Sequence, residues 1–504
     1  MKNELLIMKR KKVENDEGSS KLKRILKRVS FPLSPFLLSS FFLFTLGLSG
    51  CMVGPDYEKP EVDTPAAWRF QVTDAADTVN TAWWNQFNDP VLDQLVEDAL
   101  DNNKDVRIAA ARVEEFAARV NIARSGLFPQ FGYNGSADRS KASLDTVSGV
   151  PAGISRTNDL YNASLNVGWE LDLWGKIRRA TEAARAELLA SEEARRTVIL
   201  SLVTTVASSY IGLRTLDRQL EIAKRTLKIR KDSLYLFELQ FKGGVVSKLE
   251  VSQVRSEYEQ AAVRVPALER QIAVLENAIS VLLGKNPGSI SRGKSLDELV
   301  LIRIPGNIPS ELLERRPDIR LAEQNLIAAN AQIGVAKAQY FPSISLTGLF
   351  GYASVALSDL FNSTANLWGL NGLVLGPVFS GGRLTGQLRV SEAVQRQVLI
   401  TYLQTVQNAF REVDDALITT QKRREELDAL GRQVAALKDY ARLARLNYDE
   451  GQVSFIEVLD AERRLFDVEL IETQGRNDVY VSLVTMYKVI GGGWVVEAEG
   501  RVNK

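Results

Sequence analysis

The sequence predicts a mainly α-helical protein with a small β part, built from two tandem copies of one structural unit. Three observations predict this fold class: apolar residues spaced three and four apart over very long segments, short segments in which apolar and polar residues alternate, and an order of motifs that occurs twice. We expect each copy to contain a helix that ends at a Phe-Pro pair, two strands, and two long helices joined at a glycine.

The composition is that of a folded protein, and it argues against several classes of function. Of the 504 residues, 45% are hydrophobic and 25% charged, and 63 Lys and Arg nearly balance 62 Asp and Glu. Nucleic-acid-binding proteins normally carry a basic surplus. The chain has no histidine and one cysteine, which removes the commonest general base, a disulfide and a Cys-rich metal site. We therefore expect no enzyme, no metal site, no cofactor and no nucleic-acid partner.

The N-terminus has the pattern of an export signal over residues 1–50. A basic region is followed by an apolar stretch from Phe36 to Leu46, which is too short to span a bilayer, and then by Leu48-Ser49-Gly50-Cys51. This string resembles the bacterial lipoprotein signal, which implies that Cys51 carries an N-acyl group and an S-diacylglycerol. Several acyl chains anchor a protein firmly in a membrane. The next residue, Met52, is not the Asp that commonly retains such lipoproteins in the inner membrane, so the resemblance implies the outer membrane. The alternative is a cysteine that is incidental or buried.

The internal repeat is visible as matching motifs at two offsets. The stretch that begins at Arg107 recurs 213 residues later, at Arg320, and both copies reach a Phe-Pro pair. Further on the offset is 207 residues, and it brings Gly244 onto Gly451 and Ser247 onto Ser454. We predict five segments: the signal 1–50, a lipid-anchored segment 51–90, a first repeat 91–297, a second repeat 298–492 and a tail 493–504.

The long helices are predicted by a seam of apolar or small residues. In the first copy the seam runs from Ile199 to Phe241 with Arg230 as its one misfit, and an uninterrupted helix from about Gly175 to Phe241 would be ~100 Å long. The hairpin tips are expected at Gly243, Gly244 and Gly451, with Ser247 and Ser454 as N-caps of the returning helices. Pro266 is expected to kink or break its helix.

Four segments have the period of two that is typical of strands. The clearest runs from Tyr161 to Asp172, its partner begins near Phe131, and the second copy offers Ser343 to Gly351 and Leu367 to Pro377, which alternate less cleanly. Alternation and length fit tilted membrane strands with one lipid-facing side. The alternative is a soluble hairpin that packs on a core.

Four strands cannot close a membrane barrel, and open sheet edges are not tolerated in lipid. Chains must therefore pool their strands. Two copies would give eight strands, whose interior fills with side chains, whereas three would give a twelve-stranded barrel with a lumen. The helix seams also need partners from other copies. We expect a homotrimer in which the outer-membrane barrel continues into a long periplasmic α-helical coiled-coil barrel.

Four strings resemble one known family over nearly the whole mature chain. They are CMVGPDYEKP from Cys51, WWNQFNDPVLDQLV from Trp83, ELLERRPDIRLAEQNLIAANAQIGVAKAQYFPSISLTG from Glu311 and YDEGQVSFIEVLDAERRLF from Tyr448. The chain resembles the TolC family, specifically its lipoprotein branch paired with RND-type efflux pumps. The resemblance implies a trimeric passive exit duct for small molecules, which works with a periplasmic adaptor and an inner-membrane RND transporter. The alternatives are a duct for type I protein secretion and a structural lipoprotein that bridges envelope layers.

The resemblance also implies a periplasmic entrance ringed by carboxylates near the second hairpin tip. By the motif these are Glu457 and Asp460, three residues apart on one helical face, so a trimer would bring six carboxylates to a narrow pore that favours cations. The alternative is a solvated helix face, with Asp460 paired to Arg463 or Arg464. Tyr448 is interpreted as a seam residue rather than as a gate latch.

Three further features have structural interpretations. Some members of the family have a basic residue after the tip glycine, where this chain has Val453, so closure is expected to depend more on packing around Tyr448. In Arg315-Arg316-Pro317-Asp318, the proline suits the first turn of a helix and the aspartate its positive end. Trp83, Trp84 and Trp169 are candidates for an interfacial belt, but only Trp169 lies on a predicted membrane strand.

Overall fold

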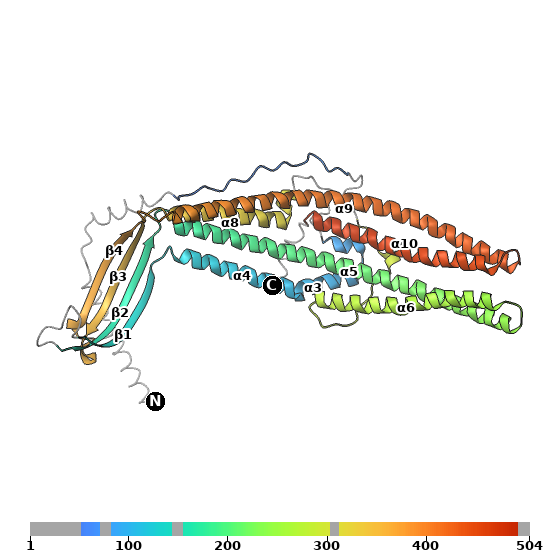
Figure 1. Ribbon diagram of the computed structural model, residues 1–504, viewed down its shortest axis with the longest axis horizontal. Helices are drawn as coiled ribbons and strands as arrows, with labels where there is room; N and C mark the ends of the chain where they lie inside the picture. The colour runs from blue at the N-terminus through green and yellow to red at the C-terminus, as the bar shows by residue number, and fades with distance from the viewer. Residues whose placement is uncertain (1–51, 71–81, 144–154, 303–311, 492–504) are drawn as a thin grey trace, which may run out of the picture.

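The computed structural model describes residues 52–70, 82–143, 155–302 and 312–491. The signal segment, Cys51 and the tail 493–504 lie outside the described residues, so their expectations stay predictions. The molecule is elongated: a β-sheet lies at one end, long helices extend from it, and two helical hairpins end together at the opposite end (Figure 1).

Strands and short 3-10 turns make up a small part of the described chain, which is mainly helical. In chain order the elements are η1 (Trp83–Phe87), α3 (Pro90–Asn102), α4 (Lys104–Ser125), β1 (Gln130–Lys141), β2 (Thr157–Leu171), α5 (Lys176–Lys242), α6 (Lys248–Leu282), η2 (Leu296–Glu298), α7 (Leu312–Arg315), α8 (Pro317–Ala338), β3 (Ser343–Ser354), η4 (Leu357–Asp359), η5 (Ser363–Ala365), β4 (Asn366–Leu375), α9 (Arg383–Asp449) and α10 (Phe455–Val489).

Each repeat has a helix, two strands, a long helix and a returning helix, and only the second strands, β2 with 15 residues and β4 with 10, differ in length. Helices α4 and α8 have 22 residues each, and strands β1 and β3 have 12 each. Helices α5 and α9 have 67 residues each, and α6 and α10 have 35 each. The first two pairs begin 213 residues apart and the last two 207 apart, as the motifs predicted. The tandem repeat and the ~100 Å helices are confirmed.

The four strands form one antiparallel sheet in the order β1-β2-β3-β4. Helices α4, α5, α8 and α9 follow the same order, each packed against the next. The sheet therefore continues into a layer of helices whose neighbours match the neighbours in the sheet (Figure 1). Towards the far end, α6 returns along α5 and α10 returns along α9.

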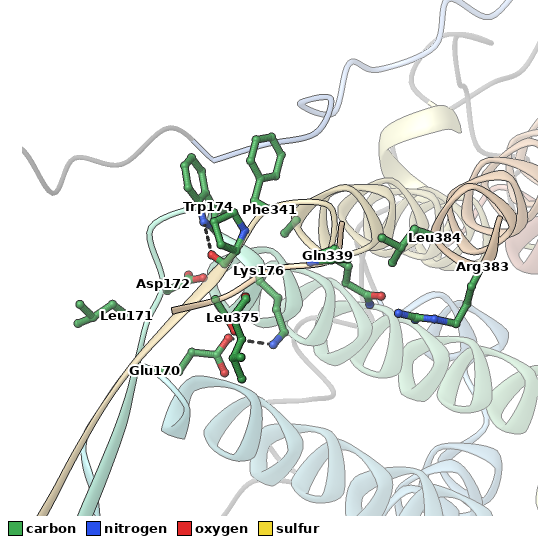
Figure 2. A pocket seen from close by; sticks show the side chains of 15 residues that line it. Glu170, Leu171, Asp172, Trp174, Lys176, Gln339, Phe341, Leu375, Arg383 and Leu384 are labelled. Atoms are coloured by element: carbon green, nitrogen blue, oxygen red, sulfur yellow. Dashed lines mark hydrogen bonds and ion pairs between the residues drawn. The ribbon is translucent and has the colours of Figure 1, made fainter. Parts of the chain in front are cut away.

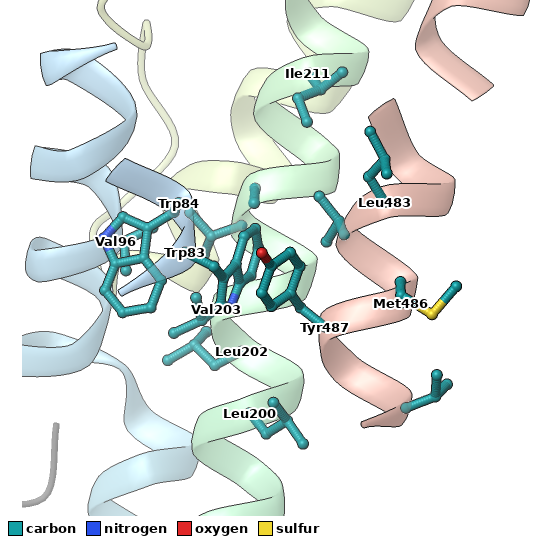
Figure 3. Packing of buried hydrophobic residues seen from close by; sticks show 14 of the residues in the cluster. Trp83, Trp84, Val96, Leu200, Leu202, Val203, Ile211, Leu483, Met486 and Tyr487 are labelled. Atoms are coloured by element: carbon teal, nitrogen blue, oxygen red, sulfur yellow. The ribbon is translucent and has the colours of Figure 1, made fainter. Parts of the chain in front are cut away.

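The main hydrophobic core lies where these helices meet α3 and η1. The indole ring of Trp83 stacks on Tyr487 of α10 with ring centroids 5.3 Å apart, and Trp84 packs beside it (Figure 3). Trp83 is 0% exposed and Trp84 7% exposed. Neither of these two candidates belongs to an interfacial belt, because the chain folds back so that η1 is packed between α3, α5 and α10.

One further expectation about the helices needs correction. Pro266 does not break α6, which is one continuous helix. Ala261 and Leu268 are buried on either side of the proline, so packing against neighbouring helices offsets the lost hydrogen bond. Part of α5 is apolar enough to cross a membrane, but 56% of that window is buried inside the molecule, which fits the core helix of a bundle.

Candidate functional site

The sheet has two chemically different faces. Residues opposite one another on neighbouring antiparallel strands share a face, and the register aligns Leu165 with both Tyr133 and Phe350. By this register one face is apolar and aromatic; it carries Phe131, Tyr133, Leu165, Val167, Trp169, Ile344, Leu346, Phe350, Tyr352, Trp368, Leu370 and Val374. The other is mostly polar and carries Asn134, Ser136, Asn162, Ser164, Asn166, Ser345, Thr347 and Asn371; its apolar exceptions are Leu160 from the first copy and Leu349, Leu367, Leu373 and Leu375 from the second.

The apolar face is exposed within the chain. Tyr133 is 89% exposed, Leu370 82% and Trp368 72%, although each is large and hydrophobic. A soluble hairpin that packed on a core would cover such side chains, so that alternative is wrong. An exposed apolar face on a sheet whose other face is polar is the pattern of a membrane barrel wall.

Both hairpin tips are tight turns that depend on a glycine. Gly244 has φ +74° and Gly451 has φ +75°, a left-handed conformation that disfavours other residues. Gly243 has φ −81° and closes α5 as its C-cap, so it has no such requirement. Ser247 and Ser454 begin the returning helices as N-caps. The sequence-predicted tip residues therefore all lie in the turns, at the end of the molecule opposite the sheet (Figure 1).

A small aromatic cluster holds the two tips together. Phe455, at the start of α10, packs on Phe237 of α5 at 4.3 Å and on Tyr448 of α9 at 4.9 Å between ring centroids. The guanidinium of Arg445 lies over the Tyr448 ring. Tyr448 is half-buried in this cluster, as a seam residue would be.

The two candidate entrance carboxylates have different surroundings within the chain. Glu457 is exposed and accepts a 3.0 Å hydrogen bond from the hydroxyl of Tyr440, which raises the pKa of that tyrosine. Asp460 accepts ion-pair contacts from Arg463 at 2.8 Å and from Arg464 at 2.7 Å. The hydrogen bond from Arg463, reinforced by the charge of Arg464, lowers the pKa of Asp460. The alternative pairing of Asp460 is therefore present in the single chain.

A buried charge cluster that the sequence pattern did not predict lies between the hairpins. The misfit Arg230 is 3% exposed; its guanidinium donates to the backbone oxygen of Glu257 at 2.6 Å, pairs with the Glu257 carboxylate at 3.1 Å, and lies over the ring of Phe466. Burial lowers the pKa of Arg230 and raises the pKa of nearby Glu462 on α10. The interruption of the apolar seam was the signal that could have found this cluster.

The segment that directly follows Cys51 is fixed at the junction between sheet and helices. The Val53 amide donates to the Trp174 oxygen, and Arg179, whose side chain is 2% exposed, pairs with Asp56 at 2.6 Å. A methyl group on Gly54 would lie 2.5 Å from the backbone of Gly334, so the close approach needs glycine. Val53 and Gly54, which closely follow the predicted lipid site, therefore lie at the base of the sheet.

A pocket of about 390 Å³ lies at the same junction (Figure 2). Glu170 and Lys176 form a 3.0 Å ion pair on its wall, and Trp174 stacks on Phe341 with ring centroids 4.6 Å apart. The Trp174 indole donates to the oxygen of Pro342 at 2.8 Å. These internal contacts tie the bases of the two repeats together, so the pocket wall is a structural joint.

The Arg-Arg-Pro-Asp motif is structural, as interpreted. Pro317 and Asp318 lie in the first turn of α8. Arg316, 7% exposed, pairs with Asp318 at 2.6 Å and Glu412 at 2.7 Å, and donates to the oxygen of Val489 at the end of α10. The motif therefore joins the beginning of the second repeat to its end.

Comparison with known proteins decides the family. The chain matches the family described as "Outer membrane efflux protein" over residues 95–285 and 308–492, one match for each copy of the repeat. The chain belongs to this family. It is 35% identical over 459 residues to the Cation efflux system protein CusC of Escherichia coli O6:H1, covering 90% of this chain and 98% of that protein.

Other relatives agree with this assignment. The Probable efflux pump outer membrane protein TtgC of Pseudomonas putida is 36% identical over 471 residues, covering 91% of this chain and 95% of that protein. The structure of the outer-membrane channel OprN superimposes with a TM-score of 0.80 at 32% identity, covering 88% of this chain and all of that one. This efflux protein is thus an outer-membrane channel, and its relatives' names favour efflux over protein secretion.

Proposed function

We propose that three copies of this efflux protein form one passive exit duct, the outer-membrane part of a tripartite RND-type pump. The single observation that carries the proposal is the four-stranded sheet with one apolar and one polar exposed face. Within the described part of the chain, β1 and β4 each have one neighbour and one unpaired edge. Lipid does not tolerate such edges, so β1 of one copy would pair with β4 of the next. Three copies give twelve strands around a polar lumen.

The proposed partners follow from the two ends of the molecule. Cys51 would be acylated and hold the junction at the membrane, because Met52 and Val53 are fixed at the base of the sheet. The hairpin tips, about 100 Å away, would meet a periplasmic adaptor and an inner-membrane RND transporter. The duct itself would catalyse no reaction. Relatives of similar identity are named for cations and for toluene, which supports a duct whose solutes are chosen by its transporter.

Planar-bilayer recording of the purified, acylated protein tests the duct, together with its mass in detergent. We expect a trimer that produces discrete single-channel conductance. A stable monomer would contradict the shared wall, and a trimer that never conducts would favour a structural lipoprotein that bridges envelope layers.

We further propose that Glu457 and Asp460 form the cation-selective constriction at the entrance. Support comes from their place on one face of α10 beside the tip and from the exposure of Glu457. Because Asp460 is already paired with Arg463 and Arg464, Glu457 would carry the larger share of the negative potential. We expect the Glu457→Ala, Asp460→Ala double variant to lose its preference for cations. Unchanged conductance and ion preference would exclude the ring.

A further inference from the structure

The loop between β3 and β4, residues 355–365, is unusually apolar for a segment at the outer end of the sheet. It lies at the end of the strands remote from the helices (Figure 1). Val355 is 75% exposed, Leu357 64% and Phe361 72%, while Asp359 is the single charged residue of the loop. Exposed apolar side chains gathered in one short loop mark a contact surface.

Several backbone amides and carbonyls of the loop form hydrogen bonds with one another. The amide of Asp359 donates to the oxygen of Ala356, the amide of Asn362 to the oxygen of Asp359, and the amide of Ala365 to the oxygen of Asn362. The side-chain amide of Asn362 also donates to the Asp359 carboxylate at 3.1 Å. A segment that enters the membrane must form hydrogen bonds among its own polar groups. This loop already forms several of them.

The loop joins the apolar face of the sheet and not the polar one. The ring of Phe361 packs edge-on against Tyr352 at 5.6 Å, and Tyr352 packs edge-on against Phe350 at 6.3 Å. Phe350 lies opposite Trp368 and Leu165 on the face assigned to lipid. A loop that covered the mouth of the lumen would contact the other face.

We propose that the β3–β4 loop is a second, non-covalent membrane anchor, with Leu357 and Phe361 immersed among the acyl chains of the outer leaflet. The aromatic row Phe350-Tyr352-Phe361 extends the lipid-facing surface beyond the last paired residue of the strands. Met52 and Val53, which directly follow Cys51, lie at the opposite end of the sheet, so an acylated Cys51 and this loop would contact opposite boundaries of the bilayer. This inference rests on the proposed barrel wall.

Site-directed fluorescence in lipid vesicles tests the anchor. The full chain is prepared as Leu357→Cys and as Phe361→Cys, labelled with the environment-sensitive fluorophore NBD, and reconstituted in phosphatidylcholine vesicles with and without a lipid that carries a nitroxide on its acyl chain. Leu370→Cys is the lipid-facing control, and Asn371→Cys, its neighbour on the polar face, is the lumen control. The unsubstituted chain, treated in parallel, reports any labelling at Cys51.

We expect the nitroxide lipid to cause a similar loss of fluorescence at Leu357, Phe361 and Leu370, and a much smaller loss at Asn371. Loop labels that emit as in water, or that emit as if buried but escape the nitroxide because a neighbouring copy covers them, would overturn the anchor. If Leu370 also escaped quenching, the proposed barrel wall would fail as well. The two failures are therefore distinguishable.

Discussion

The two hairpin tips have the same backbone and different side-chain chemistry. Glu250 and Glu457 occupy equivalent positions in the repeats, 207 residues apart. In the first tip the Glu250 carboxylate accepts from the Ser247 amide at 2.6 Å and completes a capping box. In the second tip Glu457 accepts from Tyr440 instead. Both tips therefore have the same turn, but the carboxylate stabilises a helix end in the first tip and is exposed beside Tyr440 in the second.

The hairpin bodies differ in the same way. The position of buried Arg230 is occupied by half-buried Leu437 in the second hairpin, and Phe466 corresponds to Glu259 in the first. The cation of one hairpin therefore packs on an aromatic ring of the other, and neither repeat could supply both groups in this arrangement. The comparison teaches that the hairpins are complementary partners and not interchangeable copies.

The largest expected effect tests this complementarity. Arg230→Met should lower the free energy of unfolding by about 3 kcal/mol, because the mostly buried carboxylate of Glu257 loses its cation. Thermal unfolding of the trimer in detergent, followed by circular dichroism, measures it. Leu437→Met at the equivalent position is the control and should cost less than about 1.5 kcal/mol. Equal effects at both positions would contradict the asymmetry.

The tip glycines test what the repeats share. Gly244→Ala and Gly451→Ala should each lower the free energy of unfolding by about 1–2 kcal/mol, because both residues have positive φ. No other atom lies within 4 Å of an added methyl group, so the cost is backbone strain and not a steric clash. Gly243→Ala should be nearly neutral because its backbone is in the ordinary helical region. Thermal unfolding of the three variants measures these changes in stability. A large loss at Gly243 would mean that tip packing, and not backbone strain, sets the cost.

The equivalent carboxylates should separate stability from conduction. Glu250→Ala should lower stability by about 0.5 kcal/mol through the lost cap, with no change in ion preference. Glu457→Ala should reduce the preference for cations and affect stability less. Chemical denaturation and bilayer recording on the same preparations give both quantities. If Glu250→Ala altered ion selectivity, the assignment of helix capping to the first tip and of cation preference to the second would be wrong.

The smallest expected effect is a pH dependence confined to the second hairpin. The pKa of Asp460 is lowered in the folded chain by Arg463, so its stabilising contribution is present above the unfolded pKa of about 3.9 and is lost as the pH falls through the lower folded value. Asp460→Asn should therefore be slightly less stable than the parent at pH 7, and the difference should shrink as the pH falls below the unfolded pKa of Asp460. The equivalent first-repeat variant, Gln253→Asn, should show no such trend in urea midpoints.

Features that repeat along the chain were predictable from the amino-acid order. The helix periods, the alternation of β2, the glycine turns and the serine caps each depend on residues only a few positions apart, and the structure confirms them. The tandem organisation followed because both copies preserve the same order of these local signals.

Features that join distant segments were not predictable in this way. In the sequence, Arg230 interrupts an apolar seam, and only the fold brings Glu257 and Phe466 into contact with it. The sequence does not show that Trp83 stacks on Tyr487 of α10, and Pro266 is expected to kink or break α6 until neighbouring helices are packed against it. Burial and pairing depend on groups that lie from tens to hundreds of residues away in the chain, and packing sets their positions. The sequence pattern therefore determined the shape of each element, and the tertiary structure determined which residues it contacts.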